Sequence, residues 1–297
     1  SPTFYDLSGF LTSLGAFDIA AIQYLYGANK TTNSEDNIYE LTSSLNGYEC
    51  IWDVGGNDTI DASNASDATT IDLRNATLNN ESGGGGYVSY INSEKKGFTI
   101  AHETNDSSIS CVIENAKGSN FDDIITGNSS SNKIEGRSGT DTLKGGKGDD
   151  TLDGGSGIDT SIFTGNFADY SFSLDSANGA IQIADSNSLR DGTDTVTQVE
   201  SFIFNGTTYG ADNVLTETGF NLYGYLASNL DLLTAFKDNT NSAAQHYINH
   251  GYAEGRNTTD FNPTNYLNNY ADLTAAFGSN TELSLIHISE PTRPSSI

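Results

Sequence analysis

A run of glycines and aspartates between residues 118 and 162 has the side chains and the spacing to bind a hard metal ion. Glycine recurs there every nine residues, and an aspartate or asparagine stands at the sixth position of each unit. The units begin at Gly118, Gly127, Gly136, Gly145 and Gly154, and their sixth positions are Asp123, Asn132, Asp141, Asp150 and Asp159. Carboxylate and carbonyl oxygens are the ligands that Ca²⁺ prefers. The spacing therefore predicts a series of calcium-binding turns.

Two of the units match the pattern GGxGxDxUx through their turns, which is the repeat of calcium-binding RTX proteins. They supply the further glycines Gly146, Gly148, Gly155 and Gly157. The unit at Gly136 lacks only the second glycine and keeps Gly139, whereas the units at Gly118 and Gly127 match less of the pattern. Glycines allow a tight turn whose carbonyl oxygens face inward, and the sixth-position carboxylate completes the cage. We expect about three or four ions from the intact turns.

The residues after each sixth position predict a three-residue strand with one apolar side chain inside. Ile125, Ile134, Leu143 and Leu152 hold that inward position and should stack as a narrow core. Two units would make one coil of a parallel β-roll, so alternate units should line the same edge. Asp123, Asp141 and Asp159 would then share one ion row, and Asn132 and Asp150 the opposite row. A metal-free flexible linker is the alternative, but a linker has no reason to keep this phase.

Composition supports a cation partner. The chain has 13 Lys and Arg against 39 Asp and Glu, a formal net charge of -26. Such a charge repels nucleic acid and anionic membrane surfaces, so we expect neither as a partner. No apolar run reaches the roughly 18 residues of a membrane span, so no membrane-spanning segment is expected.

An earlier segment, Trp52 to Asp61, repeats the acidic-turn chemistry with Asp53, Gly55 and Asp58.

The expected fold is mainly β, a parallel β-roll at 118–162 with flanking β segments and helices at both ends. Residues 17–26 predict a short amphipathic helix that ends at Gly27, with Asp18 near its N-terminus. Residues 31–117 predict a β-rich lead-in to the roll, and residues 163–217 a small antiparallel β cap. Residues 218–282 predict helical repeats, because pairs such as Tyr225-Leu226 recur 41 residues later as Tyr266-Leu267.

The ends of the chain and its two cysteines need separate interpretations. Residues 283–297 include LSLIHISEPTR, whose reverse translation resembles a transposon-end sequencing adapter, so we expect an adapter-derived tail; a natural polar terminus is the alternative. The start at Ser1-Pro2, without Met or a signal-like segment, favours a chain that begins within a longer protein. Cys50 and Cys111 either form a disulfide or remain two buried free thiols.

Three segments taken in order resemble the serralysin zinc metalloproteases. They are Asp18 to Asn29, Trp52 to Asp61, and Ile113 to Ala116 leading into the repeats, so the resemblance covers roughly residues 14–162. It implies that residues 1–30 are the C-terminal end of a protease domain. It also implies that Asp53, Gly55 and Asp58 bind calcium, with backbone carbonyl groups of Asn33, Glu35 and Asn37 facing them.

The zinc motif of that family, HExxHxxGxxH followed by a Met-containing turn, does not occur in this sequence, which has no Met. We therefore predict no catalytic residue here, no activity of this chain alone, and Zn²⁺ only in a missing catalytic part. His246 and His250 are four residues apart, but Tyr247 stands where a general-base Glu is needed and no third His follows. A packing or surface role in the helical repeat is the stronger interpretation of these histidines.

The resemblance implies a secreted, extracellular module that calcium folds. Its partners would be calcium ions, its own missing protease domain and the type I secretion machinery. In a cytosol poor in calcium, repulsion among the aspartates would keep the roll unfolded and exportable. The alternative is a non-enzymatic, calcium-dependent RTX adhesin or surface protein, which the helical repeats favour. A zinc motif in the upstream coding sequence would distinguish the two hypotheses.

Overall fold

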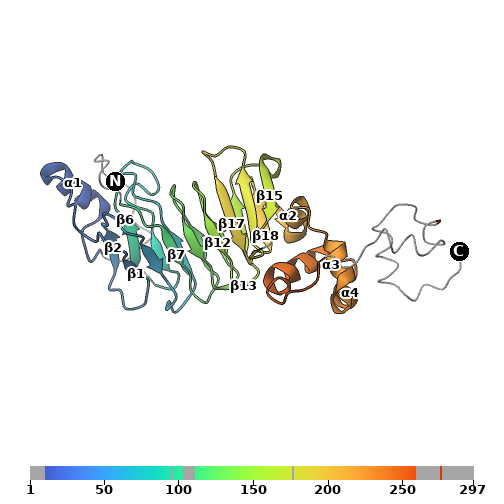
Figure 1. Ribbon diagram of the computed structural model, residues 1–297. Helices are drawn as coiled ribbons and strands as arrows, with labels where there is room; N and C mark the ends of the chain where they lie inside the picture. The colour runs from blue at the N-terminus through green and yellow to red at the C-terminus, as the bar shows by residue number, and fades with distance from the viewer. Residues whose placement is uncertain (1–10, 95, 103–110, 176, 259–274, 276–297) are drawn as a thin grey trace. The chain divides into compact units, whose positions relative to one another are not determined.

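The computed structural model describes residues 11–94, 96–102, 111–175, 177–258 and 275. The described residues form two compact units (Figure 1). The first unit contains the residues up to Ser171 together with Gln182–Thr208. The second contains Phe172–Ile181 and the residues from Tyr209 onward.

Two sheets make up most of the first unit. The first sheet has the order β1 (Ile38–Glu40), β3 (Thr59–Asp61), β7 (Asn115–Lys117), β9 (Lys133–Glu135), β12 (Thr151–Asp153), β17 (Thr193–Thr197), β16 (Ile181–Asp185), β15 (Tyr170–Leu174). The second has the order β19 (Thr207–Gly210), β18 (Ser201–Phe204), β14 (Thr160–Phe163), β11 (Thr142–Lys144), β8 (Ile124–Thr126), β4 (Thr69–Asp72), β5 (Ser89–Ile91), β6 (Gly97–Ile100), β2 (Tyr48–Ile51). Two short strands, β10 (Ser138–Gly139) and β13 (Ser156–Gly157), pair with each other.

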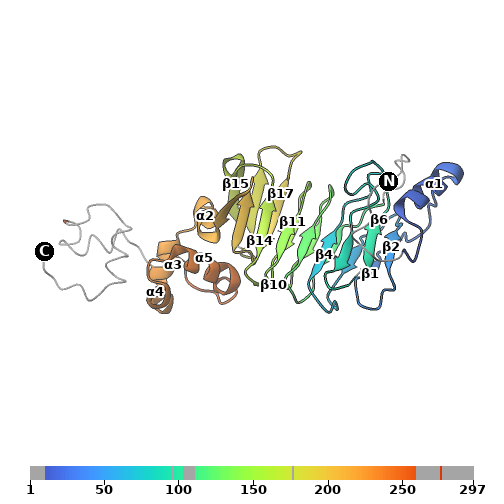
Figure 2. The ribbon, with the colours of Figure 1, turned by 180° about the vertical axis from the view of Figure 1, so that it is seen from behind.

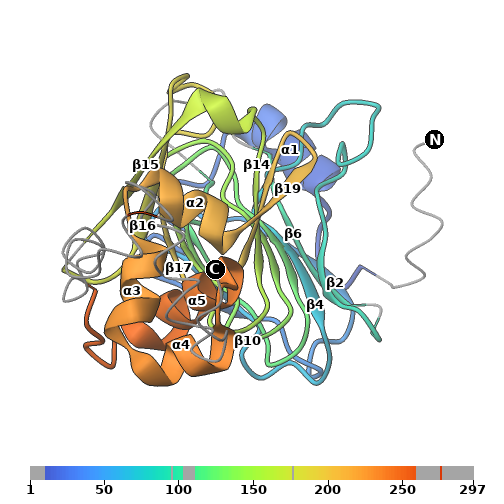
Figure 3. The same ribbon diagram turned by 90° about the vertical axis from the view of Figure 1, so that its right-hand side faces the viewer.

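The two sheets lie on opposite sides of the stack when it is viewed end-on (Figure 3). Figure 1 shows the side with β7, β12 and β17, and the view from behind in Figure 2 shows β4, β11 and β14. The pairing across the repeats is parallel and steps by 18 residues, since Ile124 pairs with Thr142 and Thr142 with Thr160. Two nine-residue units therefore make each coil, as the sequence period predicts.

The predicted apolar stack is confirmed. Ile125, Ile134, Leu143 and Leu152 are fully buried, one from each repeat strand. The stack continues in register on both sides of the repeats through the buried residues Ile60, Ile71, Ala116, Val196 and Phe202. Burial of one such side chain stabilises the folded chain by about 1.5–3 kcal/mol, so a narrow coil with one inward residue per strand gains only a small stabilisation from its apolar core.

The predicted antiparallel cap is wrong for two of its strands. β17 pairs in parallel with β12, and β18 pairs in parallel with β14, so both extend the sheets of the repeats. The reason is local: in each strand pair an acidic residue directly precedes the paired residues, Asp194 before Thr195 and Glu200 before Ser201, as in a repeat. The end of the predicted β cap at 163–217 also differs from the prediction, because Ala211–Glu217 form the helix α2, which buries Val214 and Leu215.

The predicted N-terminal helix is confirmed as α1 (Ala16–Tyr26). The Asp18 carboxylate accepts a hydrogen bond from the Gly15 N–H at 3.0 Å, and Gly27 ends the helix with φ +81°. The expected amphipathic burial is wrong, since Ala16 is the buried residue of the helix and Tyr24, Leu25 and Tyr26 are exposed. In the described chain the helix therefore buries little of its own surface.

Helices dominate the second unit. They are α2, α3 (Leu222–Ser228), α4 (Leu230–Phe236), α5 (Thr240–His246) and the π-helical turn η2 (Tyr247–Gly251). The first copy of the 41-residue repeat is thus helical and buries Tyr225, Leu226 and Leu232. Its second copy, at 266–277, and the tail at 283–297 lie outside the described residues. Among the helices that are described, none has both the length and the apolar character to cross a membrane.

Candidate metal centre

The acidic side chains of the repeats stand in two rows, each just before the paired positions of one sheet. We call these the Asp141 row (Asp123, Asp141, Asp159 and Glu200) and the Asp150 row (Asp58, Glu114, Asn132, Asp150 and Asp194). The strand register defines the members, because each precedes residues that pair with one another across the coils. The strand register therefore agrees with the prediction that Asp123, Asp141 and Asp159 lie along one edge and Asn132 and Asp150 along the other.

Each carboxylate in the Asp141 row is held by the backbone of the coil before it. The Asp141 Oδ1 atom accepts a hydrogen bond from the Asp123 N–H at 2.7 Å, and the Asp159 Oδ1 atom accepts one from the Asp141 N–H at 2.8 Å. The Asp150 row repeats the arrangement, with the Asn132 N–H donating to Asp150 Oδ1 at 2.7 Å. One oxygen of each carboxylate is thereby fixed, which also fixes the direction of the other.

The second oxygen of four row carboxylates is buried without a hydrogen-bond donor. These atoms are Oδ2 of Asp58, Asp141, Asp150 and Asp159, on residues that are at most 1% exposed. A buried carboxylate oxygen that lacks a partner is costly, and so each such atom requires a physical explanation. A cation at these positions supplies the missing partner.

At Gly136 and Gly154 a carbonyl oxygen lies close to the same glycine as the unpartnered carboxylate oxygen of Asp141 or Asp159. A Cβ atom built on Gly136 would lie 2.5 Å from Asp141 Oδ2 and 2.6 Å from the Gly154 carbonyl oxygen. Because Gly136 has no side chain, this carboxylate oxygen and this carbonyl oxygen both lie close to its backbone, and both are ligands of the kind that Ca²⁺ prefers. Elsewhere Gly139, Gly146, Gly148, Gly155 and Gly157 have positive φ and approach the neighbouring backbone closely. The donor set and the space between the turns fit calcium.

Backbone oxygens must supply most of the ligands. Within the described ranges, no three His, Cys, Asp or Glu side chains are grouped closely enough to hold a metal ion by themselves. Ca²⁺ takes six to eight oxygen ligands, and peptide carbonyl groups are common among them. One carboxylate from each coil together with turn carbonyl groups is thus the arrangement that these rows allow.

Two of the predicted ligand positions already have their hydrogen-bond partners. The Asp123 carboxylate accepts hydrogen bonds from the backbone and side chain of both Thr69 and Ser119. The Asn132 Oδ1 atom accepts the Asn128 N–H at 2.8 Å. These are the two units that match the repeat pattern least, and their turns have less need of a cation than those of Asp141, Asp150 and Asp159.

Burial changes the proton affinity of the row carboxylates. Burial and, to a smaller extent, the neighbouring carboxylates raise the pKa of Asp141 and of Asp150 to about 7 and that of Asp159 to about 6. For the same reasons the pKa of Asp194 is raised to about 8. An unperturbed Asp has a pKa of about 3.9, so calcium and protons must compete for these groups near neutral pH.

The Trp52 to Asp61 element forms a similar turn. The Asp53 carboxylate accepts hydrogen bonds from the Gly55 N–H at 2.9 Å and from the Tyr39 hydroxyl at 2.6 Å. Asp58 Oδ1 accepts the Asn37 N–H at 2.7 Å, which leaves Oδ2 without a donor.

The predicted approach of residues 33–37 to this turn is present in the structure. The Asn33 carbonyl group accepts the Val54 N–H at 3.3 Å. The Glu35 carbonyl oxygen lies 2.3 Å from the point that a Cβ atom on Gly56 would occupy. Calcium ligation by Asp53, Gly55 and Asp58 stays a prediction.

Three row members were not predicted as site residues. They are Glu114, Asp194 and Glu200, of which Asp194 and Glu200 are at most 3% exposed. Glu114 Oε2 accepts the Asp58 N–H at 2.9 Å, and Asp194 Oδ1 accepts the Asp150 N–H at 2.9 Å. The signal that could have found them is an acidic residue directly before a short strand with one inward apolar residue.

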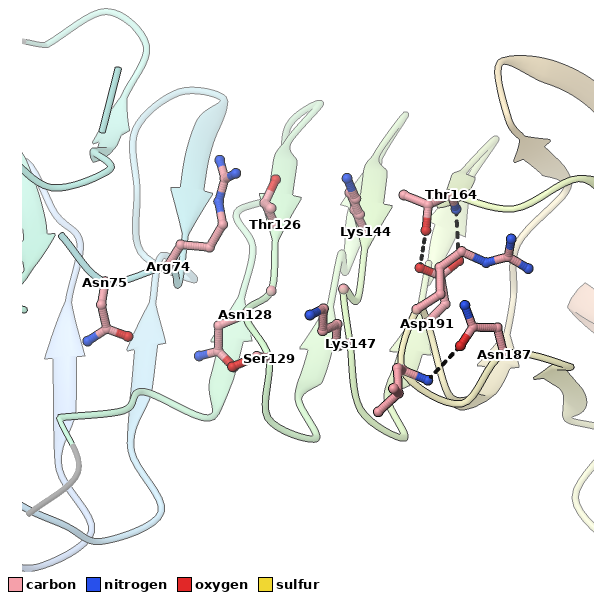
Figure 4. Close-up of a pocket in the computed structure, with 14 residues that line it drawn as sticks. Arg74, Asn75, Thr126, Asn128, Ser129, Lys144, Lys147, Thr164, Asn187 and Asp191 are labelled. Atoms are coloured by element: carbon pink, nitrogen blue, oxygen red, sulfur yellow. Dashed lines mark hydrogen bonds between the residues drawn. The ribbon is translucent and has the colours of Figure 1, made fainter. Parts of the chain in front are cut away.

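A hollow on the first unit (Figure 4) is lined by cations and by the turn glycines Gly127 and Gly146, and none of the row carboxylates is among its lining residues. It has a volume of about 580 Å³, and Arg74, Lys144, Lys147 and Arg190 are among its lining residues. Arg74 forms an ion pair with Asp72 at 2.6 Å, and Arg190 one with Asp185 at 2.6 Å. The positive charge of these four side chains disfavours the binding of a metal cation in the hollow.

Cys111 is buried and Cys50 is half-buried, and both Sγ atoms lie 3.9 Å from the Ile51 carbonyl oxygen. Disulfide formation between them stays a prediction. His246 Nδ1 forms a hydrogen bond with the Tyr225 hydroxyl at 2.8 Å, which is consistent with the packing role expected for it.

Replacing Gly136 with Ala should impair one calcium position, because the new Cβ atom would occupy the space between Asp141 and the Gly154 carbonyl group. We expect one calcium affinity to fall by about ten- to a hundredfold, the usual cost of disturbing a metal site. Isothermal titration calorimetry of both proteins measures it. Gly15→Ala is the control, since its Cβ would meet nothing closer than 3.5 Å. Unchanged calcium binding by the Gly136 variant would contradict the assignment.

Comparison with known proteins agrees with this geometry. The family model of the RTX calcium-binding nonapeptide repeat matches residues 114–143 and 126–160. A serralysin of Proteus mirabilis is 35% identical over 127 residues, which are 39% of this chain and 22% of that protein. Serralysin G of Dickeya chrysanthemi is 36% identical over 128 residues, 39% of this chain and 23% of that protein.

Metalloprotease AprA of Pseudomonas entomophila is 37% identical over 127 residues, again 39% of this chain and 23% of that protein. The chain thus spans less than a quarter of the length of these relatives. From these matches we conclude that the chain carries RTX calcium-binding nonapeptide repeats and is homologous to part of the serralysins.

Proposed function

We propose that this chain is the calcium-binding module of an extracellular, serralysin-like zinc metalloendopeptidase, and that calcium folds it. The observation that carries the proposal is the pair of carboxylate rows, in which Asp141, Asp150 and Asp159 each point a buried, unpartnered oxygen into a glycine turn. Oxygens in such positions favour the folded chain only when a cation neutralises them.

In this proposal residues 118–162 are an RTX β-roll. Residues 31–117 lead into it, residues 163–217 cap it, and residues 1–30 end a protease domain. The turn glycines and the sixth-position side chains supply the calcium ligands, as do Asp53, Gly55 and Asp58. Support comes from the 18-residue register and from the closeness of the glycine carbonyl oxygens to the carboxylates.

The mechanism follows from charge. Without a cation, the buried carboxylates of consecutive coils repel one another and must lose water or take up protons, which disfavours the folded roll. Bound calcium supplies the positive charge that offsets this cost. The turn carbonyl groups and the backbone N–H donors of the rows then hold the carboxylates in place.

Secretion would use the difference in calcium between compartments. Extracellular calcium modules bind with Kd values of about 10⁻⁴ to 10⁻³ M, so the roll would stay unfolded inside the cell and fold outside it. This suits export by a type I pathway, which carries unfolded chains. Zinc would be held in a catalytic part that precedes this chain in the whole protein, where the substrate preference would also be determined.

A calcium titration of the full chain from EDTA, followed by far-UV circular dichroism, tests the proposal. We expect a cooperative gain of β signal at millimolar calcium. An equal concentration of magnesium should give none, because Mg²⁺ requires near-ideal octahedral geometry and keeps its water. A spectrum that is unchanged by calcium would overturn the proposal.

An RTX adhesin or surface protein is the second candidate, and the helical second unit favours it. Residues 218–258 contain α3, α4 and α5, which nothing in the calcium mechanism uses. The upstream coding sequence separates the candidates. HExxHxxGxxH and a Met-turn there would support the protease, and a complete upstream sequence without them would support the adhesin.

A further inference from the structure

The segment between β17 and β18 repeats the backbone contacts of a calcium turn, although it has no glycine repeat. In the nonapeptides the first glycine of each turn donates to the coil that follows, as the Gly136 N–H does to the Asp153 carbonyl group at 2.8 Å. Gly154 N–H donates in the same way to the Thr197 carbonyl group at 3.1 Å. Gln198 therefore follows the acceptor carbonyl group as the first glycine of another repeat would, although its φ of +50° differs from that of the first glycines, none of which is positive.

The sixth position of this turn is also filled. The Glu200 Oε2 atom accepts the Asp159 N–H at 2.7 Å, just as Asp159 Oδ1 accepts the Asp141 N–H at 2.8 Å. The following N–H, of Ser201, donates to the Asp159 carbonyl group at 3.0 Å, as Thr160 does to Asp141 at 2.8 Å. Glu200 is two positions after Gln198, whereas Asp159 is five positions after Gly154, and the longer Glu side chain suits the shorter turn.

The oxygens at this turn have the same geometry as at the repeats. A Cβ atom built on Gly154 would lie 2.7 Å from Asp159 Oδ2 and 2.1 Å from the Gln198 carbonyl oxygen. The corresponding oxygens at Gly118 are Asp123 Oδ2 and the Gly136 carbonyl oxygen, both at 2.6 Å. Asp159 is fully buried, and its Oδ2 atom has no hydrogen-bond donor. An unpartnered oxygen thus points at a carbonyl group that no repeat supplies.

We propose that a further calcium ion binds between the Gly154–Asp159 turn and residues 197–200, with Asp159, the Gln198 carbonyl group and Glu200 among its ligands. The site lies partly outside residues 114–160, where the repeat family matches. It closes the Asp141 row with a turn of different sequence. The inference rests on the proposed function, because it assumes that the row binds calcium.

Glu200→Gln is the test, measured as the number of calcium ions bound to the full chain by equilibrium dialysis and native mass spectrometry. The Gln amide oxygen can still accept the Asp159 N–H, and an amide already occupies a row position at Asn132, where its Nδ2 donates to the Glu114 carbonyl group and its Oδ1 accepts the Asn128 N–H. The fold should therefore persist, and circular dichroism in calcium checks it. We expect the variant to bind one calcium ion fewer than the parent chain. Glu217→Gln, on an exposed side chain of α2, is the matched control and should bind the full number.

The outcomes separate the two claims. A parent chain that binds no calcium would overturn the proposed function and this site with it. A Glu200→Gln variant that binds as many ions as the parent with the same affinities, while Asp141→Asn loses one, would overturn this site alone. Glu200→Asp keeps the charge and shortens the side chain. If Glu200→Gln does not fold, Glu200→Asp should weaken one ion by about ten- to a hundredfold, and unchanged affinity there would overturn the site.

Discussion

Replacing Asp141, Asp150 and Asp159 with Asn in one chain should abolish the calcium-induced gain of β structure. Asn keeps an oxygen for the backbone N–H that each Asp accepts, but it removes the negative charge and the unpartnered carboxylate oxygen. A site occupied at a hundred times its Kd stabilises by about 2.7 kcal/mol, so three such sites contribute about 8 kcal/mol. That is comparable to the roughly 5–15 kcal/mol stability of a whole domain.

The measurement is far-UV circular dichroism of the full chain over a calcium series up to about 10 mM, which is a hundred times a Kd of 10⁻⁴ M. The control carries Glu81→Gln, Glu217→Gln and Asp238→Asn, which change the net charge equally on exposed side chains. The control should fold with calcium as the parent chain does. A triple Asp variant that folded at the same calcium concentration as its control would show that the rows do not couple metal binding to folding.

The repeats could be predicted from the sequence because a strict period constrains register. A nine-residue unit with one inward apolar residue has few ways to stack, and the 18-residue pairing of Thr142 with Thr160 follows from it. The same period placed Asp141 and Asp159 on one edge and Asp150 on the other. These positions depend on spacing alone and need no knowledge of distant contacts.

The limits of prediction lie where the period breaks. Thr195 pairs with Thr151 across 44 positions, and Ser201 pairs with Thr160 across 41, because β15 and β16 are inserted between coils. No fixed spacing connects Asp194 or Glu200 to the repeats, so their place in the rows was missed. The antiparallel cap was a wrong prediction for the same reason, since alternating apolar residues define a strand but not its partner.

Local hydrogen bonding also modifies what the pattern suggests about individual ligands. Asp123 fits the repeat as well as Asp141 does, yet Ser119 and Thr69 occupy its oxygens. Ser119 stands where the full pattern has glycine, and a hydroxyl group there supplies a donor that glycine lacks. The residue at the second position of a unit therefore helps to decide whether the carboxylate at the sixth position needs a cation as its partner.

Acidification should have opposite effects on the chain in EDTA and in calcium. In EDTA the folded state binds protons more tightly than the unfolded state, because burial raises the pKa of Asp141 and Asp150 to about 7 and of Asp159 to about 6. Stability then falls as the pH rises from about 4, near the unfolded pKa, to about 8, above the folded values. The metal-free chain should thus have more β structure at pH 5 than at pH 8.

In calcium the slope should reverse, because the ion binds the deprotonated carboxylates and protons compete with it. The calcium concentration at half-folding, measured by circular dichroism at pH 6, 7 and 8, should therefore decrease as the pH rises. The Asn triple variant provides the control for the EDTA series. It lacks three of the titrating groups but keeps Asp194, so its pH dependence should be weaker than that of the parent chain. If the parent chain in EDTA gained structure from pH 5 to pH 8, the buried carboxylates would not be what keeps it unfolded without calcium, and its sensitivity to calcium would need another origin.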